Sequence, residues 1–254
     1  MHPNQTSWLG RQPVAVKGIT QVICFPFAGG GASSFGSWRN LLSPELNLIP
    51  LCPPGRERRR NEPPVTNASI AAEQISHELI QLTDQPIVFF GHSLGAQLAF
   101  ETAQKLNQLQ GPNVALLVMS GSKPPSEREG KKNWHLLPDN QFIEAISKLG
   151  GTPSEVLLNK ELMDLFIPQL RVDFALLASL NITKRTPLSC PIFAFGGQDD
   201  PLVTPKELQG WSQETTGSFD SVIFPGKHFF IQESKRDVIS MLNFIISNML
   251  ANKL

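Results

Sequence analysis

The sequence has no excess of charge of either sign, few cysteines and no long apolar run, and each shortage excludes a class of protein. Its 22 Lys and Arg residues balance 22 Asp and Glu residues, so no global field favours nucleic acid or an anionic membrane. The three cysteines show neither a CxxC pair nor another metal-ligand spacing. We therefore expect buried thiols in a reducing compartment, no metal site and no nucleic-acid partner.

Both ends of the sequence lack a membrane or targeting signal. Residues 1–11 are polar and contain no apolar stretch of the kind found in signal peptides. The most apolar late segment, Val238–Leu250, is interrupted by Ser and Asn, and its apolar residues recur at helical spacing. This pattern predicts a helix packed on a core, too short and too polar to cross a bilayer. We expect a soluble, cytoplasmic, monomeric protein with no membrane partner.

Strand-like and helical segments alternate along most of the 254 residues, a length that suits one large α/β domain. Apolar runs bounded by Pro, Gly and other turn residues predict buried strands. These strands are Thr20–Pro26, Leu46–Cys52, Ile87–Phe90, Val114–Ser120, Pro191–Phe195 and Ser221–Phe224. The first helices expected between them are Phe35–Leu42, Ala68–Thr83 and Gln97–Leu109. The alternation is typical of a mostly parallel sheet covered by helices on both faces.

The pattern changes at about residues 122–186, where helical segments follow one another with no strand between them. Because this block lies between predicted strands, we interpret it as a helical lid inserted into the sheet domain. The chain is then a single domain, residues 1–254, with a core of about 14–121 and 187–254.

Capping patterns mark several helix starts around this insertion. Asp139 is expected to cap a helix that runs to about Leu149. The sequences Thr152–Glu155 and Thr204–Glu207 each have the form of a capping box with proline at the first helical position. A further helix is predicted over Leu162–Leu180.

The segment Gly91-His92-Ser93-Leu94-Gly95 joins a predicted strand to a predicted helix. A serine with glycines two residues before and after it, in this context, is the nucleophile elbow of α/β-hydrolases. Larger side chains at the glycine positions would collide with neighbouring backbone in so tight a turn. The sequence therefore predicts an α/β-hydrolase fold with Ser93 as the nucleophile.

A serine nucleophile needs a base and an acid, which follow it in the order Ser, Asp, His in this fold. Of the five histidines, only His228 follows a late strand, and it is our candidate base. The acid is expected just after the strand Pro191–Phe195, where Asp199 and Asp200 stand side by side. We favour Asp200, although both residues also suit a simple turn before Pro201.

Two backbone amides are needed to stabilise the oxyanion. One is that of Leu94, directly after the serine. For the other we choose Ala28, with Phe27 second, because the glycine-rich loop after the first strand lets backbone approach a substrate closely. Phosphate binding by this loop fits poorly, since it contains no GxGxxG and no Lys-Ser/Thr after the glycines.

With these motifs in place, the chain resembles the stand-alone type II thioesterases of nonribosomal peptide and polyketide synthesis. The generic elbow contributes little to the likeness. More discriminating segments are Pro54-Gly55-Arg56-Glu57-Arg58-Arg59, Leu149-Gly150-Gly151-Thr152-Pro153 and Leu170-Arg171-Val172-Asp173-Phe174. The likeness covers roughly residues 21–248, including the lid.

The resemblance implies hydrolysis of acyl groups from the phosphopantetheine thiol of acyl or peptidyl carrier proteins, as editing of mis-primed or stalled synthases. It implies the triad Ser93, Asp200 and His228, and no bound cofactor. Release of medium- or long-chain fatty acids, general esterase activity and a non-catalytic binding protein are the alternatives. The chain has Phe27 where many relatives have His or Tyr, and Ser179–Asn181 where many have aromatic residues. These departures leave the acyl preference open.

Two further groups of residues allow two interpretations each. The arginines Arg56, Arg58, Arg59 and Arg60 suit an acidic carrier-protein surface or a phosphate, but equally a solvated loop. Apolar residues of the lid suit an acyl tunnel, or else packing of the lid on itself. The candidates for substrate binding are Phe27, Met163, Phe166, Leu170 and Phe174.

Overall fold

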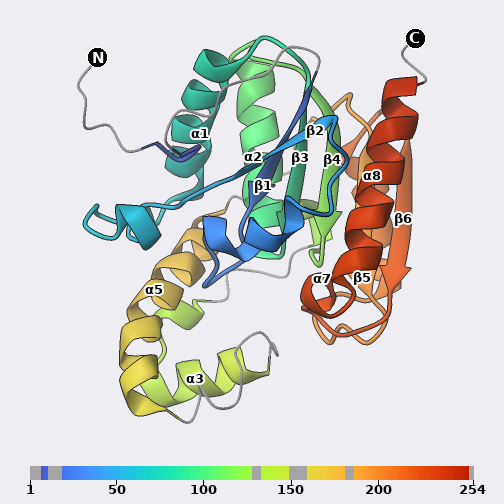
Figure 1. Ribbon diagram of the computed structural model, residues 1–254. Coiled ribbons are helices and arrows are strands. Elements are labelled where there is room, and N and C mark those ends of the chain that lie inside the picture. Colours follow the sequence, from blue (N-terminus) through green and yellow to red (C-terminus); the bar gives the residue numbers. More distant parts are fainter. Residues whose placement is uncertain (1–6, 11–18, 128–132, 149–158, 181–185, 252–254) are drawn as a thin grey trace.

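Six parallel strands form one sheet in the order β2-β1-β3-β4-β5-β6 (Figure 1). The computed structural model describes residues 7–10, 19–127, 133–148, 159–180 and 186–251. The strands are β1 (Thr20–Phe25), β2 (Leu46–Pro50), β3 (Ile87–His92), β4 (Val114–Ser120), β5 (Ile192–Gly197) and β6 (Phe219–Phe224). Each of the six overlaps a run predicted from the sequence, although β1 and β2 end one and two residues earlier than predicted and β5 begins one residue later.

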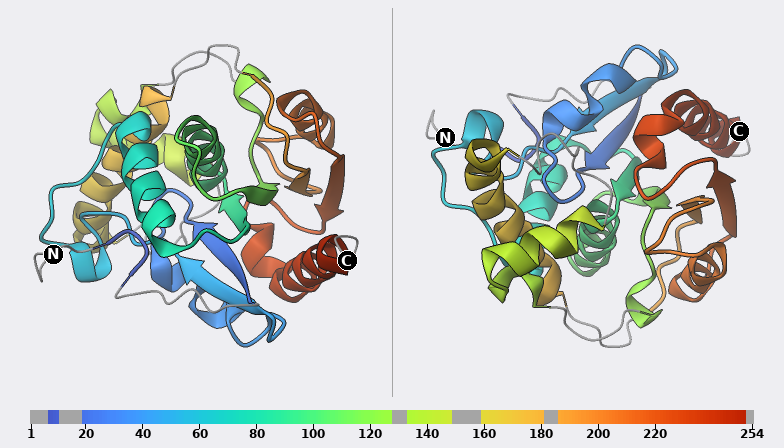
Figure 2. Two further views of the ribbon diagram at one scale, coloured as in Figure 1. Left: turned by 90° about the horizontal axis from the view of Figure 1, so that it is seen from above. Right: turned by 90° about the horizontal axis from the view of Figure 1, so that it is seen from below.

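Helices cover both faces of the sheet, as Figure 2 shows. The helices α1 (Ala68–Leu82) and α2 (Leu94–Gln108) lie on one face. The 3-10 helix η1 (Ala32–Trp38) and the C-terminal helix α8 (Lys235–Ala251) lie on the other. Shorter helices complete the β5–β6 side: α6 (Pro205–Leu208), η5 (Gln209–Glu214) and α7 (Phe230–Glu233). The α/β-hydrolase fold class predicted from the sequence is confirmed.

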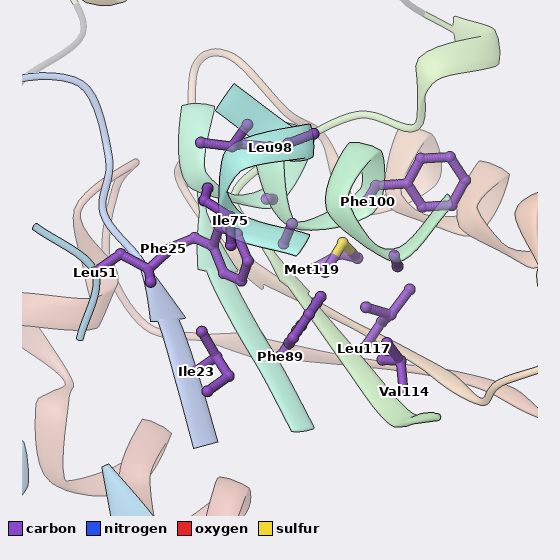
Figure 3. Close-up of a cluster of buried hydrophobic side chains, with 14 of the residues drawn as sticks. Ile23, Phe25, Leu51, Ile75, Phe89, Leu98, Phe100, Val114, Leu117 and Met119 are labelled. Atoms are coloured by element: carbon purple, nitrogen blue, oxygen red, sulfur yellow. The ribbon is translucent and has the colours of Figure 1, made fainter. Parts of the chain in front are cut away.

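The central strands are apolar on both faces because helices cover both faces and successive side chains point to opposite ones. Ile23, Phe25 and Phe89 lie in the cluster between the sheet and the α1–α2 layer (Figure 3). Their neighbours Val88 and Phe90 belong to the opposite cluster, with η1 and α8. Burial on both faces explains why the sequence shows continuous apolar runs here instead of alternation.

Two tryptophan side chains and all three cysteine side chains are buried as well. Trp38 and Trp211 are almost completely inaccessible to solvent, in the η1 and η5 helices. Cys24, Cys52 and Cys190 are free thiols and buried. The expectation of three buried thiols is therefore confirmed.

The block between β4 and β5 contains α3 (Asp139–Ser147) and α5 (Lys160–Ser179), with the short helices η3 (Pro125–Glu127) and η4 (Trp134–Leu136). Figure 1 shows α3 and α5 beyond the carboxyl ends of the strands. Phe142 and Ile146 of α3 pack against the first part of α5 in a separate small cluster. The last part of α5 reaches the main core through Leu176. One helix thus connects the predicted lid to the sheet domain.

Local helix starts differ in part from the sequence predictions. The segment expected as a helix from Phe35 is the 3-10 helix η1, which already ends at Trp38. Asp139 is not a cap: it is the first residue of α3, and its carboxylate accepts a bond from Arg171 instead. The capping box Thr204–Glu207 is confirmed, with reciprocal bonds at the start of α6. Thr152–Glu155 lies outside the described residues.

Within the described part of the chain, no helix is long and apolar enough to cross a membrane.

Candidate active site

The candidate site lies where the order of the strands reverses. The chain forms β1, moves outward to β2 and returns to the other side of β1 as β3. The loops that follow β1 and β3 therefore diverge at the carboxyl edge of the sheet, where ligands bind in open α/β sheets. Phe25, the last residue of β1, pairs with Gly91 of β3. The glycine-rich loop after β1 thus begins beside the predicted elbow.

Ser93 occupies a strained turn between β3 and α2. Its φ of 54° and ψ of −117° lie in a region that costs about 1–3 kcal/mol for a residue with a side chain. A Cβ at Gly91 would lie 2.4 Å from the Gly95 carbonyl oxygen, and one at Gly95 would lie 2.1 Å from the Phe25 carbonyl oxygen. Only glycine fits at these positions, as the elbow motif predicts.

A chain of hydrogen bonds connects Ser93, His228 and Asp200. His228 Nε2 lies 3.0 Å from Ser93 Oγ, and His228 Nδ1 lies 2.8 Å from Asp200 Oδ2. Since an ionised carboxylate only accepts hydrogen bonds, Nδ1 carries the proton and Nε2 is free to accept the serine proton. His228 and Asp200 are both buried. The three residues follow β3, β5 and β6, whose carboxyl ends share one edge of the sheet.

Asp200, and not Asp199, is the residue beside the imidazole. The Asp200 side chain is completely buried, and its second oxygen accepts a hydrogen bond of 2.9 Å from the Leu202 amide. Asp199 is exposed, and its backbone amide donates to the Gly226 carbonyl at 3.0 Å. That backbone bond ties the loop after β5 to the loop that carries His228.

The loop after β1 offers two amides to a ligand. Gly29 and Gly30 donate their amides to Asp173 Oδ2 at 2.6 Å and to the Phe27 carbonyl at 2.9 Å. Within the described residues the amides of Phe27 and Ala28 donate to no protein acceptor, and neither does that of Leu94. Leu94 begins α2, where the helix dipole adds positive potential. These are the amides predicted for the oxyanion hole.

Aromatic side chains lie beside the imidazoles of His92 and His228. The Phe27 ring lies 5.0 Å from the Phe229 ring and 5.9 Å from the His92 ring, centroid to centroid. His92 is fully buried, and its Nδ1 lies 2.9 Å from Ser120 Oγ. Burial, assisted by repulsion from His228, holds the pKa of His92 well below its usual value. His92 therefore stays neutral beside the triad.

The arginine run divides into internal and exposed side chains. Arg56 and Arg59 are buried, and Arg59 bonds to Glu62 and to the Cys52 carbonyl. Arg58 and Arg60 are exposed. Of the four arginines, only these two are therefore accessible for the contact with an acidic carrier-protein surface or a phosphate that the sequence suggested.

Arg56 forms a buried ion pair with Asp173 of α5, which sequence reasoning did not identify. The two residues are 117 positions apart. Each lies in a segment already recognised as discriminating, and nothing in either segment indicates that they meet.

The candidate lid residues fall into two groups. Met163, Leu170 and Phe174 are buried in the small cluster shared with α3, against which Ala28 also packs. Phe166 is outside that cluster, and its side chain is 38% exposed. The buried three therefore pack the block on itself, at a place that adjoins the glycine-rich loop.

The arrangement combines a hydroxyl, an imidazole in the accepting tautomer, a carboxylate and unpaired amides. This set is suited to acyl transfer through a covalent intermediate. No group of three or more potential metal-ligand side chains occurs in the described residues.

Comparison with known proteins gives the family. A model of the thioesterase domain family matches residues 20–246. The chain belongs to this family. The thioesterase is 39% identical to the gramicidin S biosynthesis protein GrsT of Aneurinibacillus migulanus, over 87% of each chain. The resemblance identified from the motifs is thereby confirmed, and the protein is a hydrolase that acts on thioesters.

Solved structures are similar over nearly the whole thioesterase. The crystal structure of ClbQ, from the colibactin NRPS/PKS pathway, matches with a TM-score of 0.85 and 33% identity, covering 92% of this chain and 99% of ClbQ. The type II thioesterase BorB from the borrelidin biosynthetic cluster matches with a TM-score of 0.82 and 32% identity, covering 94% and 95%.

Proposed function

We propose that this thioesterase hydrolyses acyl groups from the phosphopantetheine thiol of acyl or peptidyl carrier proteins and so clears mis-primed or stalled synthases. The observation that carries the proposal is the hydrogen-bonded chain Ser93–His228–Asp200 at the reversal of the strand order, next to which the loop with unpaired amides begins. The similarity to GrsT, ClbQ and BorB supports the pathway class.

In the acylation step, Ser93 Oγ attacks the thioester carbonyl carbon while His228 Nε2 takes the serine proton. Asp200 holds the imidazole in the required tautomer and stabilises the imidazolium. The oxyanion accepts hydrogen bonds from the amides of Leu94 and Ala28, each worth about 10²–10³ in rate. The tetrahedral intermediate then collapses, the carbon–sulfur bond breaks, and the thiolate takes the proton from His228.

The acyl-enzyme is released by the reverse sequence with water as the nucleophile. His228 removes a proton from water, the hydroxide attacks the acyl carbon, and Ser93 Oγ leaves with the proton from His228. A thiol with a pKa of about 8.5 is a good leaving group. The barrier therefore lies mainly in forming the oxyanion, which these residues stabilise without a cofactor.

The partner in this proposal is a carrier protein, and the enzyme acts as a cytoplasmic monomer. Of the arginine run, Arg58 and Arg60 are the side chains exposed for contact with an acidic carrier surface. Arg58 also donates a hydrogen bond of 2.8 Å to the Ser7 carbonyl. Arg60 is therefore the better candidate for a contact that changes only the KM for the carrier protein.

The decisive experiment is hydrolysis of acetyl-loaded carrier protein by the purified enzyme, with Ser93→Ala as the matched control. We expect wild-type release at least about 10³-fold faster than that of the variant. Equal release by both proteins would contradict the proposal. The assay should include short and long acyl chains, on carrier protein and on coenzyme A. A strong preference for long acyl chains, whether on carrier protein or on coenzyme A, would instead favour release of fatty acids as the function.

A further inference from the structure

We infer that Arg56 and Asp173 are positioning residues of this thioesterase: their buried ion pair holds the glycine-rich oxyanion loop, residues 27–31, and couples it to α5. The inference rests on the proposed function, because the loop matters only if its amides stabilise an oxyanion. Neither side chain contacts Ser93 or His228 among the described contacts. Their effect on catalysis is exerted through backbone.

The pair holds the loop through hydrogen bonds to the backbone of Gly29 and Gly30. Asp173 Oδ2 accepts the Gly29 amide at 2.6 Å, and an Arg56 guanidinium nitrogen donates to the Gly30 carbonyl. The same Asp173 oxygen accepts a hydrogen bond from the other terminal nitrogen of Arg56. Gly29 has a φ of 83°, so its backbone could not hold a side chain there without strain. Two side chains therefore fix the backbone directly after the free amides of Phe27 and Ala28.

The pair also fixes the loop to α5. Asp173 belongs to α5, and Arg56 donates a second hydrogen bond, of 3.2 Å, to the Gln169 carbonyl one turn earlier in that helix. Arg56 itself follows Gly55 in the loop after β2. One guanidinium thus connects the loop after β1, the loop after β2 and α5. Its planar fork is suited to hold three acceptors in a fixed geometry.

The burial of this pair favours a role in geometry over a role in stability. Arg56 and Asp173 are each about 6% exposed. A buried pair is often no more stabilising than apolar side chains of similar size, because removing two charges from water is costly. Burial raises the pKa of Asp173, opposed by Arg56 and the Gly29 amide. What apolar side chains cannot supply is the directed bonds to Gly29 and Gly30.

The coupling makes the oxyanion hole depend on the position of α5. The first part of α5 packs on α3 through the small cluster that the two helices share, and Ala28 contacts the same cluster. Displacement of α5 from the sheet would withdraw Asp173 from Gly29 and release the loop. A shift of about 1 Å in a reacting group costs on the order of 10²-fold in rate. The site is therefore complete only when α5 is docked.

The test compares Arg56→Ala, Arg56→Lys and Asp173→Asn with the control Arg236→Ala, whose arginine is exposed on α8. Substrates are a nitrophenyl acetate ester and an acetyl thioester of N-acetylcysteamine, so carrier binding does not enter. Rates are divided by the fraction of sites titrated with a fluorophosphonate, which removes loss by misfolding.

We expect Arg56→Ala and Asp173→Asn to lower kcat about 10²-fold with KM within about threefold of wild type. The kcat of Arg56→Lys should lie between those of the two variants and that of the wild type, because an ammonium group cannot donate hydrogen bonds in the planar, forked geometry of a guanidinium. Ethylguanidinium should restore at least about tenfold of the kcat of Arg56→Ala and leave Asp173→Asn unchanged. Arg236→Ala should match wild type.

The inference is overturned if the kcat per titrated site of Arg56→Ala stays within about threefold of wild type, or if only KM changes. It is equally overturned if Arg56→Met/Asp173→Leu, which keeps an apolar pair in the same place, retains wild-type kcat. Failure of the proposed function looks different. In that case the wild type would hydrolyse the nitrophenyl ester but not the acyl carrier protein, and the comparison of variants on the ester would still apply.

Discussion

The two sides of the candidate site are held in place by different means. Ser93, Asp200 and His228 follow directly after strands of one sheet, and backbone bonds link the loops after β5 and β6. The glycine-rich loop after β1, which contains the proposed oxyanion amides, is held by side chains of Arg56 and Asp173 from distant segments. The parallel sheet thus aligns the candidate triad through its own hydrogen-bond pattern. A loop that leaves the sheet needs a separate, charged support.

The largest effect should come from the carboxylate on the triad side. Asp200→Asn is expected to lower kcat by on the order of 10⁴-fold, because the amide favours the wrong imidazole tautomer. The matched control is Asp199→Asn, whose side chain is exposed, whereas that of Asp200 is buried beside His228. Steady-state kinetics on a nitrophenyl ester measure both variants. Similar losses in the two variants would mean that the carboxylates share the role.

The next comparison concerns packing in the sheet and in the lid block. Phe89→Ala should reduce the free energy of unfolding by about 3–5 kcal/mol, because Phe89 is completely buried in the main core. Phe142→Ala creates a cavity in the small cluster instead. We expect its main effect to be lost hydrogen-exchange protection in α3, with a smaller change in urea unfolding.

Equal global losses for Phe89→Ala and Phe142→Ala would show that the block and the sheet unfold as one unit. The two regions would then not differ in stability, and α5 would have no independent motion by which to affect the oxyanion loop.

On the side of the candidate triad, the buried His92 next to Ser93 should make stability depend on pH. Because the pKa of native His92 is well below the unfolded value of 6.5, the unfolded chain binds a proton that the native chain does not. Stability is therefore present above about pH 6.5 and is lost as the pH falls below it, by up to about 1.4 kcal/mol per pH unit. His92→Asn should remove this dependence. Urea unfolding at pH 7, 6 and 5 measures it, and parallel curves for both proteins would contradict it.

The smallest effect is expected from a surface pair that contrasts with Arg56–Asp173. The hydrogen bond from Lys123, at 2.6 Å, lowers the pKa of Glu207 to about 2. Its stabilisation is present above the unfolded pKa of 4.5 and is lost as the pH falls toward 2. Because both side chains are partly exposed, we expect Glu207→Gln to cost less than about 1 kcal/mol at pH 7. Lys206→Met is the control, and a difference that does not diminish as the pH falls from 7 to 2 would contradict the assignment.

Sequence reasoning identified the strands and the order of the candidate triad because both depend on local patterns. Buried parallel strands are continuous apolar runs, and the elbow needs glycines at fixed spacing around Ser93. The choice between Asp199 and Asp200 depended on which way adjacent turn residues point, which only the structure reveals. The start of α3 was misassigned because Arg171, far along the chain, takes the Asp139 carboxylate.

The pairing of Arg56 with Asp173 could not be predicted from the sequence, for a different reason. Charged residues in a sequence are most often solvated, and two positions 117 residues apart carry no local sign that they meet. The contact arises from the return of α5 over the carboxyl edge of the sheet. It depends on tertiary packing, and only the folded chain shows it.

The burial of the three cysteines has a consequence for an enzyme that works among thiols. Each turnover on a carrier protein would free a pantetheine sulfhydryl, and oxidised arms are ready partners for mixed disulfides. Burial raises the pKa of all three thiols, that of Cys190 to about 11, so they stay protonated at neutral pH and do not form the reactive thiolate. The enzyme can therefore handle many sulfhydryl products without being captured by one.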